Sequence, residues 1–242
     1  MRAKEFTGLE EGWKDWAVGA AMGAAALGSH GKALDKHPIK QPTAQHQQVK
    51  QKAPIPQPPA AHKKKERYEI WCLSNNPSEE TIVHREAHNA GIKGRELAQF
   101  LAQVRHESAD FGRMHEMGGR EYFNRMYDPK FAPKTAKLLG NKYVSDGERY
   151  HGRGFIQITG RDHYRQAGKD LGLPLEQKPE LASKPDIAAK IAVWYWKNRV
   201  RPQVDDFNNT PAVTKAINGK AMRGLKDRIN SFKEYTEYIF IK

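Results

Sequence analysis

The sequence predicts a mainly α-helical domain that follows an N-terminal extension without a packed core. Apolar residues recur at intervals of three and four in several segments, among them 97–104 and 225–235, which is the spacing of one buried helix face. Residues 37–66 are instead rich in Pro, Gln and Lys and hold too few large apolar side chains to offset the entropy of folding. We therefore expect a leader or docking segment at 1–36, a disordered linker at 37–66 and one folded domain at 67–242.

Composition narrows the class of protein. The formal net charge is +13, and residues 67–242 hold 30 Lys and Arg against 22 Asp and Glu, which predicts attraction to nucleic acid, anionic lipid or an anionic cell-wall polymer. Cys72 is the only cysteine, so the chain can form no internal disulfide and no Cys-rich zinc site. The run 17–28 is short and interrupted by Gly, so we expect no transmembrane segment and find no clear signal peptide.

The first two expected helices lead to a candidate acid. One begins after Ser78, a capping residue followed by two acids, and runs to about Asn89. The next, at about 95–106, has an apolar face that ends at Glu107. Partial loss of hydration there favours the protonated carboxyl that a general acid needs. The alternative is a frayed helix end that leaves Glu107 in water.

The segment 111–127 is rich in Gly, Met and aromatic residues and contains two further carboxylates, Glu116 and Glu121. Phe123 and Tyr127 lie at helical spacing, so we expect them in the core. A short helix containing Ala, Lys and Leu and a loop rich in Gly, Asn and Asp follow within 131–148.

The run YHGRGFIQITG occupies residues 150–160. Its glycines allow the backbone to approach a ligand closely or to adopt positive φ. The apolar residues at 155, 156 and 158 are consistent with a buried β-strand, with Gln157 and Thr159 projecting together, as well as with a binding site. No phosphate-binding pattern follows the glycines, which argues against a nucleotide loop.

Four helices are expected after this run. One contains Tyr164 and Leu171, and the others lie at about 187–200, 210–217 and 224–239. Trp194 and Tyr195 lie on the apolar face of the second of these helices, so we expect them in the core.

Four motifs together resemble family 19 glycoside hydrolases. His106-Glu107-Ser108, the run at 150–160, Ile217-Asn218-Gly219 and Asp227-Arg228-Ile229 occur in the order seen in that family. The resemblance spans about residues 68–240 and is closest to phage lytic enzymes, in which the linking loops are short. It implies a lysozyme-like fold of the α+β superfamily, mostly helical, with two lobes around a substrate cleft. It also implies hydrolysis of β-1,4 bonds in N-acetylated glycans with inversion and without a cofactor.

The resemblance assigns the catalytic roles. Glu107 matches the general acid, Glu116 is similar in placement to the carboxylate that activates water, and Thr159 matches a hydroxyl residue that helps to hold that water. Glu121 is a rival to Glu116 because the second carboxylate lies further along in plant chitinases, and Glu148 stays open as well. An inverting pair would be separated by roughly 6.5 to 9.5 Å, and a retaining pair by roughly 5 to 5.5 Å.

The remaining roles concern the substrate and the support of the acid. Tyr150, Gln157 and Asn218 match substrate-contacting positions, and Arg228 matches an arginine that supports the acid from behind. We expect no metal, since the histidines are scattered and no HExxH spacing occurs.

These expectations combine into a phage peptidoglycan hydrolase, an N-acetylmuramidase that acts as a monomer at the bacterial cell wall or periplasm. We expect it to be located in a phage virion or in the host cell, and residues 1–66 could contact other virion proteins. Positive charge favours the anionic wall over neutral chitin, but a chitinase remains the alternative. A wall-docking virion protein without activity is an alternative of another class. Nucleic-acid binding is supported by charge alone, so we expect no specific nucleic-acid partner.

Overall fold

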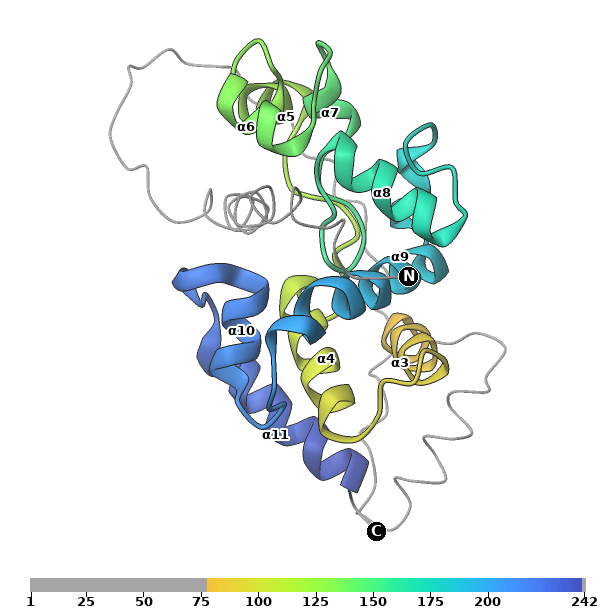
Figure 1. Ribbon diagram of the computed structural model, residues 1–242, viewed down its shortest axis with the longest axis vertical. Coiled ribbons are helices and arrows are strands. Elements are labelled where there is room, and N and C mark those ends of the chain that lie inside the picture. Colours follow the sequence, from red (N-terminus) through yellow and green to blue (C-terminus); the bar gives the residue numbers. More distant parts are fainter. Residues whose placement is uncertain (1–77, 241–242) are drawn as a thin grey trace, which may run out of the picture.

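The computed structural model describes residues 78–240. The predicted leader at 1–36, the predicted linker at 37–66 and the start of the predicted domain lie outside the described residues. Within residues 78–240 no helix is both long and apolar enough to cross a membrane. The described part is helical, and Figure 1 shows its helices in two groups.

The larger group surrounds the main hydrophobic core. It consists of α3 (Glu79–Asn89), α4 (Gly94–Glu107), α9 (Pro185–Tyr195), α10 (Thr210–Asn218) and α11 (Leu225–Phe240). α11 packs along α4, and α3 packs on α9. α4 is central because its apolar face is buried, as the sequence predicted.

Ser78 confirms the predicted start of α3. Its side chain accepts a hydrogen bond from the Thr81 backbone N–H at 3.3 Å, which satisfies one of the free donors of the first turn.

The smaller group has a core of its own. It consists of α5 (Arg120–Tyr127), α6 (Pro133–Leu139) and α7 (Asp146–Arg149). Phe123, Tyr127 and Leu139 are buried together, with Tyr122 and Met126 packed against them. This confirms the expectation that Phe123 and Tyr127 are core residues. α8 (Arg161–Leu171) contacts both α6 and α9 and thereby joins the two groups.

Short helical segments complete the described part of the chain. A π-helix at Trp196–Val200 (η3) continues α9, so the expected helix at 187–200 changes its hydrogen-bond pattern part-way. Among residues 78–240, short 3-10 helices lie at Pro179–Ser183 (η2), Arg201–Gln203 (η4) and Gly219–Ala221 (η5).

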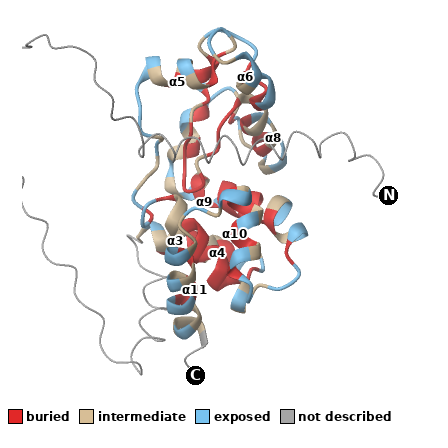
Figure 2. Cartoon of the chain, turned by 90° about the vertical axis from the view of Figure 1, so that its left-hand side faces the viewer, coloured by how far each residue is buried: buried red, intermediate tan, exposed pale blue. Residues whose placement is uncertain are grey.

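Two segments, 108–119 and 150–160, connect the helix groups. Figure 2 shows buried residues on α4, α9 and α10 and along the 150–160 connection, whereas most of 108–119 is exposed or half-buried. The strand interpretation of 155–158 is wrong: the segment forms a turn, and Gln157 has a positive φ of 52°. Arg153 instead makes isolated antiparallel bridges to His115 and to Ile158. The connection thus pairs with the segment that contains Glu116.

Candidate active site

Glu107 is the last residue of α4, and the structure excludes a frayed end in open water. Its side chain is 16% exposed and lies against Arg228 of α11, whose side chain is 1% exposed. The Arg228 Nη2 donates to Glu107 Oε1 at 2.6 Å. The structure therefore brings together the predicted acid and the arginine expected behind it, although 121 residues separate them.

A small cavity of about 10 Å³ lies beside Glu107, which is room for about one water molecule. Tyr195, expected only as a core residue, lines this cavity, and burial together with the nearby charge of Glu107 raises the pKa of Tyr195. The other lining residues are Phe100, Gln103, Val104, Ile156, Ala192, Trp196 and Ile217.

A left-handed turn follows Glu107. Ala109, Asp110 and Phe111 have φ values of 49°, 62° and 61°, which side chains other than Gly rarely adopt. The buried Ser108 hydroxyl donates to the Val104 carbonyl at 2.7 Å and accepts from the Phe111 N–H at 3.1 Å. The turn directs the chain from the acid towards Glu116.

Glu116 is held through both carboxylate oxygens. Tyr127 donates its hydroxyl hydrogen to Oε1 at 2.6 Å, and the Gly152 N–H donates to Oε2 at 2.9 Å. The Glu116 N–H also donates to the Gly152 carbonyl at 2.9 Å. Burial raises the pKa of Glu116 above its ordinary value, although the two hydrogen bonds to its oxygens favour the charged form. A carboxylate with a raised pKa is a better general base near neutral pH.

The turn at 152–159 adjoins both carboxylates. A Cβ placed on Gly152 would lie 3.1 Å from both Glu116 Oε2 and Gln157 Oε1, so glycine allows this close approach. Ile156, the neighbour of Gln157, lines the cavity beside Glu107. Thr159 is 3% exposed and donates its hydroxyl hydrogen to the Gln157 carbonyl at 2.9 Å.

His151 is a neutral neighbour of this turn. Its ring stacks on Phe123 with a centroid distance of 4.2 Å and an interplanar angle of 3°. Burial and then the charge of Arg153 lower the pKa of His151 to about 4. Its titration therefore lies well below neutral pH.

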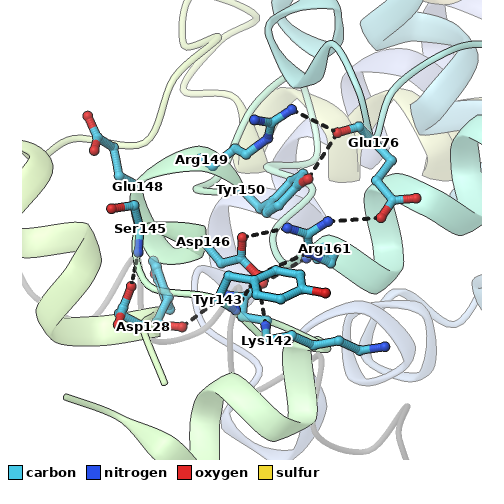
Figure 3. Close-up of polar contacts among 12 residues, drawn as sticks. Asp128, Lys142, Tyr143, Ser145, Asp146, Glu148, Arg149, Tyr150, Arg161 and Glu176 are labelled. Carbon is cyan, nitrogen blue, oxygen red and sulfur yellow. Dashed lines mark hydrogen bonds and ion pairs between the residues drawn. The ribbon is translucent and has the colours of Figure 1, made fainter. Parts of the chain in front are cut away.

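The Tyr150 side chain lies beside Arg161 and reaches Glu176 (Figure 3). It is 1% exposed, and its hydroxyl donates to the Glu176 carbonyl at 3.0 Å. Arg161 covers the Tyr150 ring at 4.8 Å and binds Asp146 and the Glu176 carboxylate. Burial opposes ionisation of Asp146, but hydrogen bonds, above all from Arg161, hold its pKa below the ordinary value. In this conformation the Tyr150 hydroxyl is bound to Glu176, and its contact with substrate stays a prediction.

Asn218 ends α10 and is 6% exposed. Its Oδ1 accepts from the Arg223 N–H at 2.8 Å, and the Arg223 carbonyl accepts from Arg228 Nε at 3.0 Å. Asn218 therefore stabilises the loop that holds Arg228, while its contact with substrate stays a prediction.

The rival carboxylates have different surroundings. Glu121 is exposed in the first turn of α5, and within the described chain it forms no hydrogen bond or ion pair through its side chain. Glu148 pairs with Arg120 at 3.2 Å. Of the three, Glu116 is the one bound to the 150–160 turn through its side chain.

Two contributors to the site were not predicted from the sequence. Gln103 is 1% exposed, accepts a hydrogen bond from Arg228 and donates one to Thr214 of α10. The sequence feature that could have identified Gln103 is its position four residues before Glu107, on the same helix face. Tyr127 was assigned to the core alone, but a buried tyrosine hydroxyl usually has a partner.

No cluster of three or more His, Cys, Asp or Glu side chains suited to a metal ion occurs among residues 78–240.

Residues 80–235 match the glycoside hydrolase family 19 profile, described as class I chitinase. The chain belongs to glycoside hydrolase family 19. This match covers the whole candidate site, from α3 to the middle of α11, and both supported carboxylates fall within it.

Other family 19 proteins share about a third of their aligned residues with this chain. An endochitinase of Arabidopsis thaliana is 34% identical over 156 residues, which cover 62% of this chain and 50% of the plant protein. A family 19 domain-containing protein of Haemophilus influenzae is 35% identical over 157 residues, covering 56% and 76%. An inactive endochitinase of Arabidopsis thaliana is 30% identical over 156 residues. The chain spans about half the length of these plant relatives.

The family 19 fold is also seen in a crystal structure of a bacterial family 19 chitinase. The two share 21% identity with a TM-score of 0.52, over 74% of this chain and 95% of the bacterial one. The predicted mainly helical, lysozyme-like fold class is confirmed.

Proposed function

We propose that this chain hydrolyses β-1,4 bonds in an N-acetylated glycan, with Glu107 as general acid and Glu116 as general base. The main observation in support is that the two carboxylates, both beside the 152–159 turn, have different hydrogen-bond partners. Glu107 is bound through one oxygen by the buried Arg228, and Glu116 is bound through both oxygens by Tyr127 and Gly152. Carboxylates in different surroundings can take the acid and base roles of a glycosidase.

In the proposed inverting reaction, Glu107 protonates the glycosidic oxygen while a water molecule attacks the opposite face of the sugar. Glu116 accepts a proton from that water. Its two hydrogen bonds leave further lone pairs on a carboxylate, so it can still bind the water. Thr159 donates to the Gln157 carbonyl and so keeps its oxygen lone pairs for the same water.

The substrate we propose is peptidoglycan, cleaved between N-acetylmuramic acid and N-acetylglucosamine. The net charge of +13 favours an anionic polymer over a neutral one. The short segments between the motifs favour a phage lytic enzyme, acting at the bacterial wall from a virion or from within the host. Residues 1–66 would then supply contacts to other virion proteins.

Chitin is the second candidate substrate, because several relatives are endochitinases and share the family with this chain. The two polymers contain the same type of linkage. Digestion of purified peptidoglycan and of chitin, followed by identification of the new reducing end and its anomer, distinguishes the two and tests inversion. Release of reducing ends from chitin alone would overturn the peptidoglycan proposal.

Glu107→Gln and Glu116→Gln test the catalytic assignment. Each variant removes one proton-transfer group and should lower kcat by at least about 100-fold, since general acid or base catalysis contributes that much. Glu121→Gln is the matched control, as it changes an exposed glutamate of the same region and should leave kcat unchanged.

Full wall lysis by both Glu107→Gln and Glu116→Gln would overturn the assignment of these two residues as the catalytic pair. The alternative of another class, a wall-docking protein without activity, predicts no lysis by the unmodified protein, and one relative is itself an inactive endochitinase. Binding of the unmodified protein to peptidoglycan without release of reducing ends would support that account.

A further inference from the structure

A row of buried polar side chains runs along α4 and ends at Glu107. Gln99 and Gln103 are 0% and 1% exposed and lie two turns and one turn before the acid. Gln99 Nε2 donates to Thr210 Oγ1 at 2.7 Å, and Gln103 Nε2 donates to Thr214 Oγ1 at 3.3 Å. Gln103 Nε2 also lies 3.5 Å from Gln99 Oε1. The two amides therefore bind α10 in the same way, each through its Nε2.

The last amide oxygen in this row contacts the arginine of the site. Arg228 Nη1 donates to Gln103 Oε1 at 2.6 Å, and Arg228 Nη2 donates to Glu107 Oε1 at 2.6 Å. The Arg228 Nε donates to the Arg223 carbonyl at 3.0 Å. Three acceptors on three different nitrogens fix the plane of the guanidinium, because its donors have a rigid geometry.

Gln103 is a neutral partner for this cation. A carboxylate in its place would compete with Glu107 for the charge of Arg228, whereas an apolar residue would leave a buried N–H without an acceptor, which is costly. Gln103 also lines the cavity beside Glu107. Gln103 therefore lies close to the acid, but among the described residues its side chain forms no hydrogen bond to the Glu107 carboxylate.

We propose that Gln103 is a positioning residue, which holds Arg228 so that the guanidinium occupies Oε1 of Glu107 and leaves Oε2 to hold the transferable proton. The role rests on the proposed function. As the bond between the anomeric carbon and the glycosidic oxygen breaks, the proton on Oε2 passes to that oxygen. The oxygen of water bonds to the anomeric carbon, and the proton lost by the water goes to Glu116.

Gln103→Met tests the role and keeps the size and flexibility of the side chain. Arg228 loses one of its three acceptors and its plane is no longer fixed, so kcat should fall by about 10- to 100-fold while KM stays near its original value. Gln103→Glu keeps an acceptor for Arg228 but adds a charge that draws on the same cation. Arg228 then interacts less strongly with Glu107, so the alkaline limb of the kcat–pH profile should move upward.

Gln99→Met is the matched control. It removes an equally buried glutamine of the same row that contacts α10 but does not bind Arg228. If the two glutamines had only a structural role, the two methionine variants should have equal effects on the melting temperature, on kcat and on the pH profile. The positioning role predicts similar losses in melting temperature, with the kcat loss confined to Gln103→Met.

Equal kcat and unchanged pH limbs in Gln103→Met, Gln103→Glu and Gln99→Met would overturn the positioning role. Glu107→Gln, measured alongside, separates this outcome from failure of the proposed function. Loss of activity in Glu107→Gln with normal Gln103 variants refutes only the positioning role, whereas full activity in Glu107→Gln refutes the catalytic assignment itself.

Discussion

The hydroxyl of Tyr127 connects the small hydrophobic core to the candidate base. It donates to Glu116 Oε1 at 2.6 Å and favours the ionised carboxylate, while burial raises the pKa of Glu116. Tyr127→Phe removes the donor but keeps the ring in the core. The pKa of Glu116 should rise further, so the acidic limb of kcat/KM should move to higher pH, because the base must be ionised to act.

A pH series of kcat/KM measures this shift, with Tyr122→Phe as control. Tyr122 packs on the same core, but its hydroxyl makes no hydrogen bond to Glu116 in the described part of the chain. His151 is not the source of a limb near neutral pH, since its pKa is about 4. An acidic limb that stays in place in Tyr127→Phe would show that another group sets it.

Predictions from the sequence were least complete for the contacts of individual side chains. The position of Glu107 at the end of an apolar helix face follows from local spacing, and so do the buried positions of Phe123 and Tyr127. The contacts of Gln103 with Arg228 and of Tyr127 with Glu116 depend on how distant elements pack. Periodicity gives the face of a residue but does not give its partner across the fold.

The left-handed turn at Ala109–Phe111 is the most strained connection next to the acid. A positive φ costs roughly 1 to 2 kcal/mol for each residue other than Gly, so the surrounding contacts must offset it. Phe111 is 5% exposed and packs on Phe155 with a centroid distance of 6.2 Å. The Ser108 hydroxyl joins the Val104 carbonyl of α4 to the Phe111 N–H of the turn, and Arg105 binds Asp110 at 2.7 Å.

Ser108→Ala should destabilise the domain by about 1 to 3 kcal/mol, because it leaves the buried Phe111 N–H without an acceptor. Unfolding by urea measures this change. Ser183→Ala is the control, since the Ser183 hydroxyl makes a bond of similar length, 2.8 Å, at an exposed position. Equal effects of the two substitutions would mean that Ser108 does not stabilise the turn.

Helices were predicted more fully than the connections between them. The start of α3 follows from a Ser cap, which is a local signal. The segment 155–158 was compatible with a strand, but its tertiary setting makes it a turn. The left-handed turn has no glycine at its three positions, so no sequence signal marked it.

The charge of the whole molecule bears on the choice of polymer. Raising the ionic strength from about 0.01 M to about 1 M shortens the range of electrostatic attraction from about 30 Å to about 3 Å. Cleavage of peptidoglycan should therefore slow with added salt, whereas cleavage of neutral chitin oligosaccharides should not. Parallel initial rates on both substrates test this, and equal slowing would mean that salt acts on the protein rather than on its attraction to the wall.

At this scale the sequence predicted the class of fold and the order of its helices, because apolar periodicity and helix ends are local properties. It predicted the family from four motifs spread over residues 106–229. The spacing of apolar residues does not reveal the separation into a large and a small core, since that separation depends on which helices pack together.

Because the two cores differ in size, we expect local thermal stability to differ between the two parts of the domain. Glu107 rests on α4 in the large core, whereas the Tyr127 that binds Glu116 belongs to a cluster of three buried and two partly buried side chains. Regions with few buried apolar contacts open at lower cost than the rest of a protein. On warming, the base should lose its support while the acid stays in place. Thermal inactivation would then reflect local unfolding of the small core, while the rest of the domain is still folded.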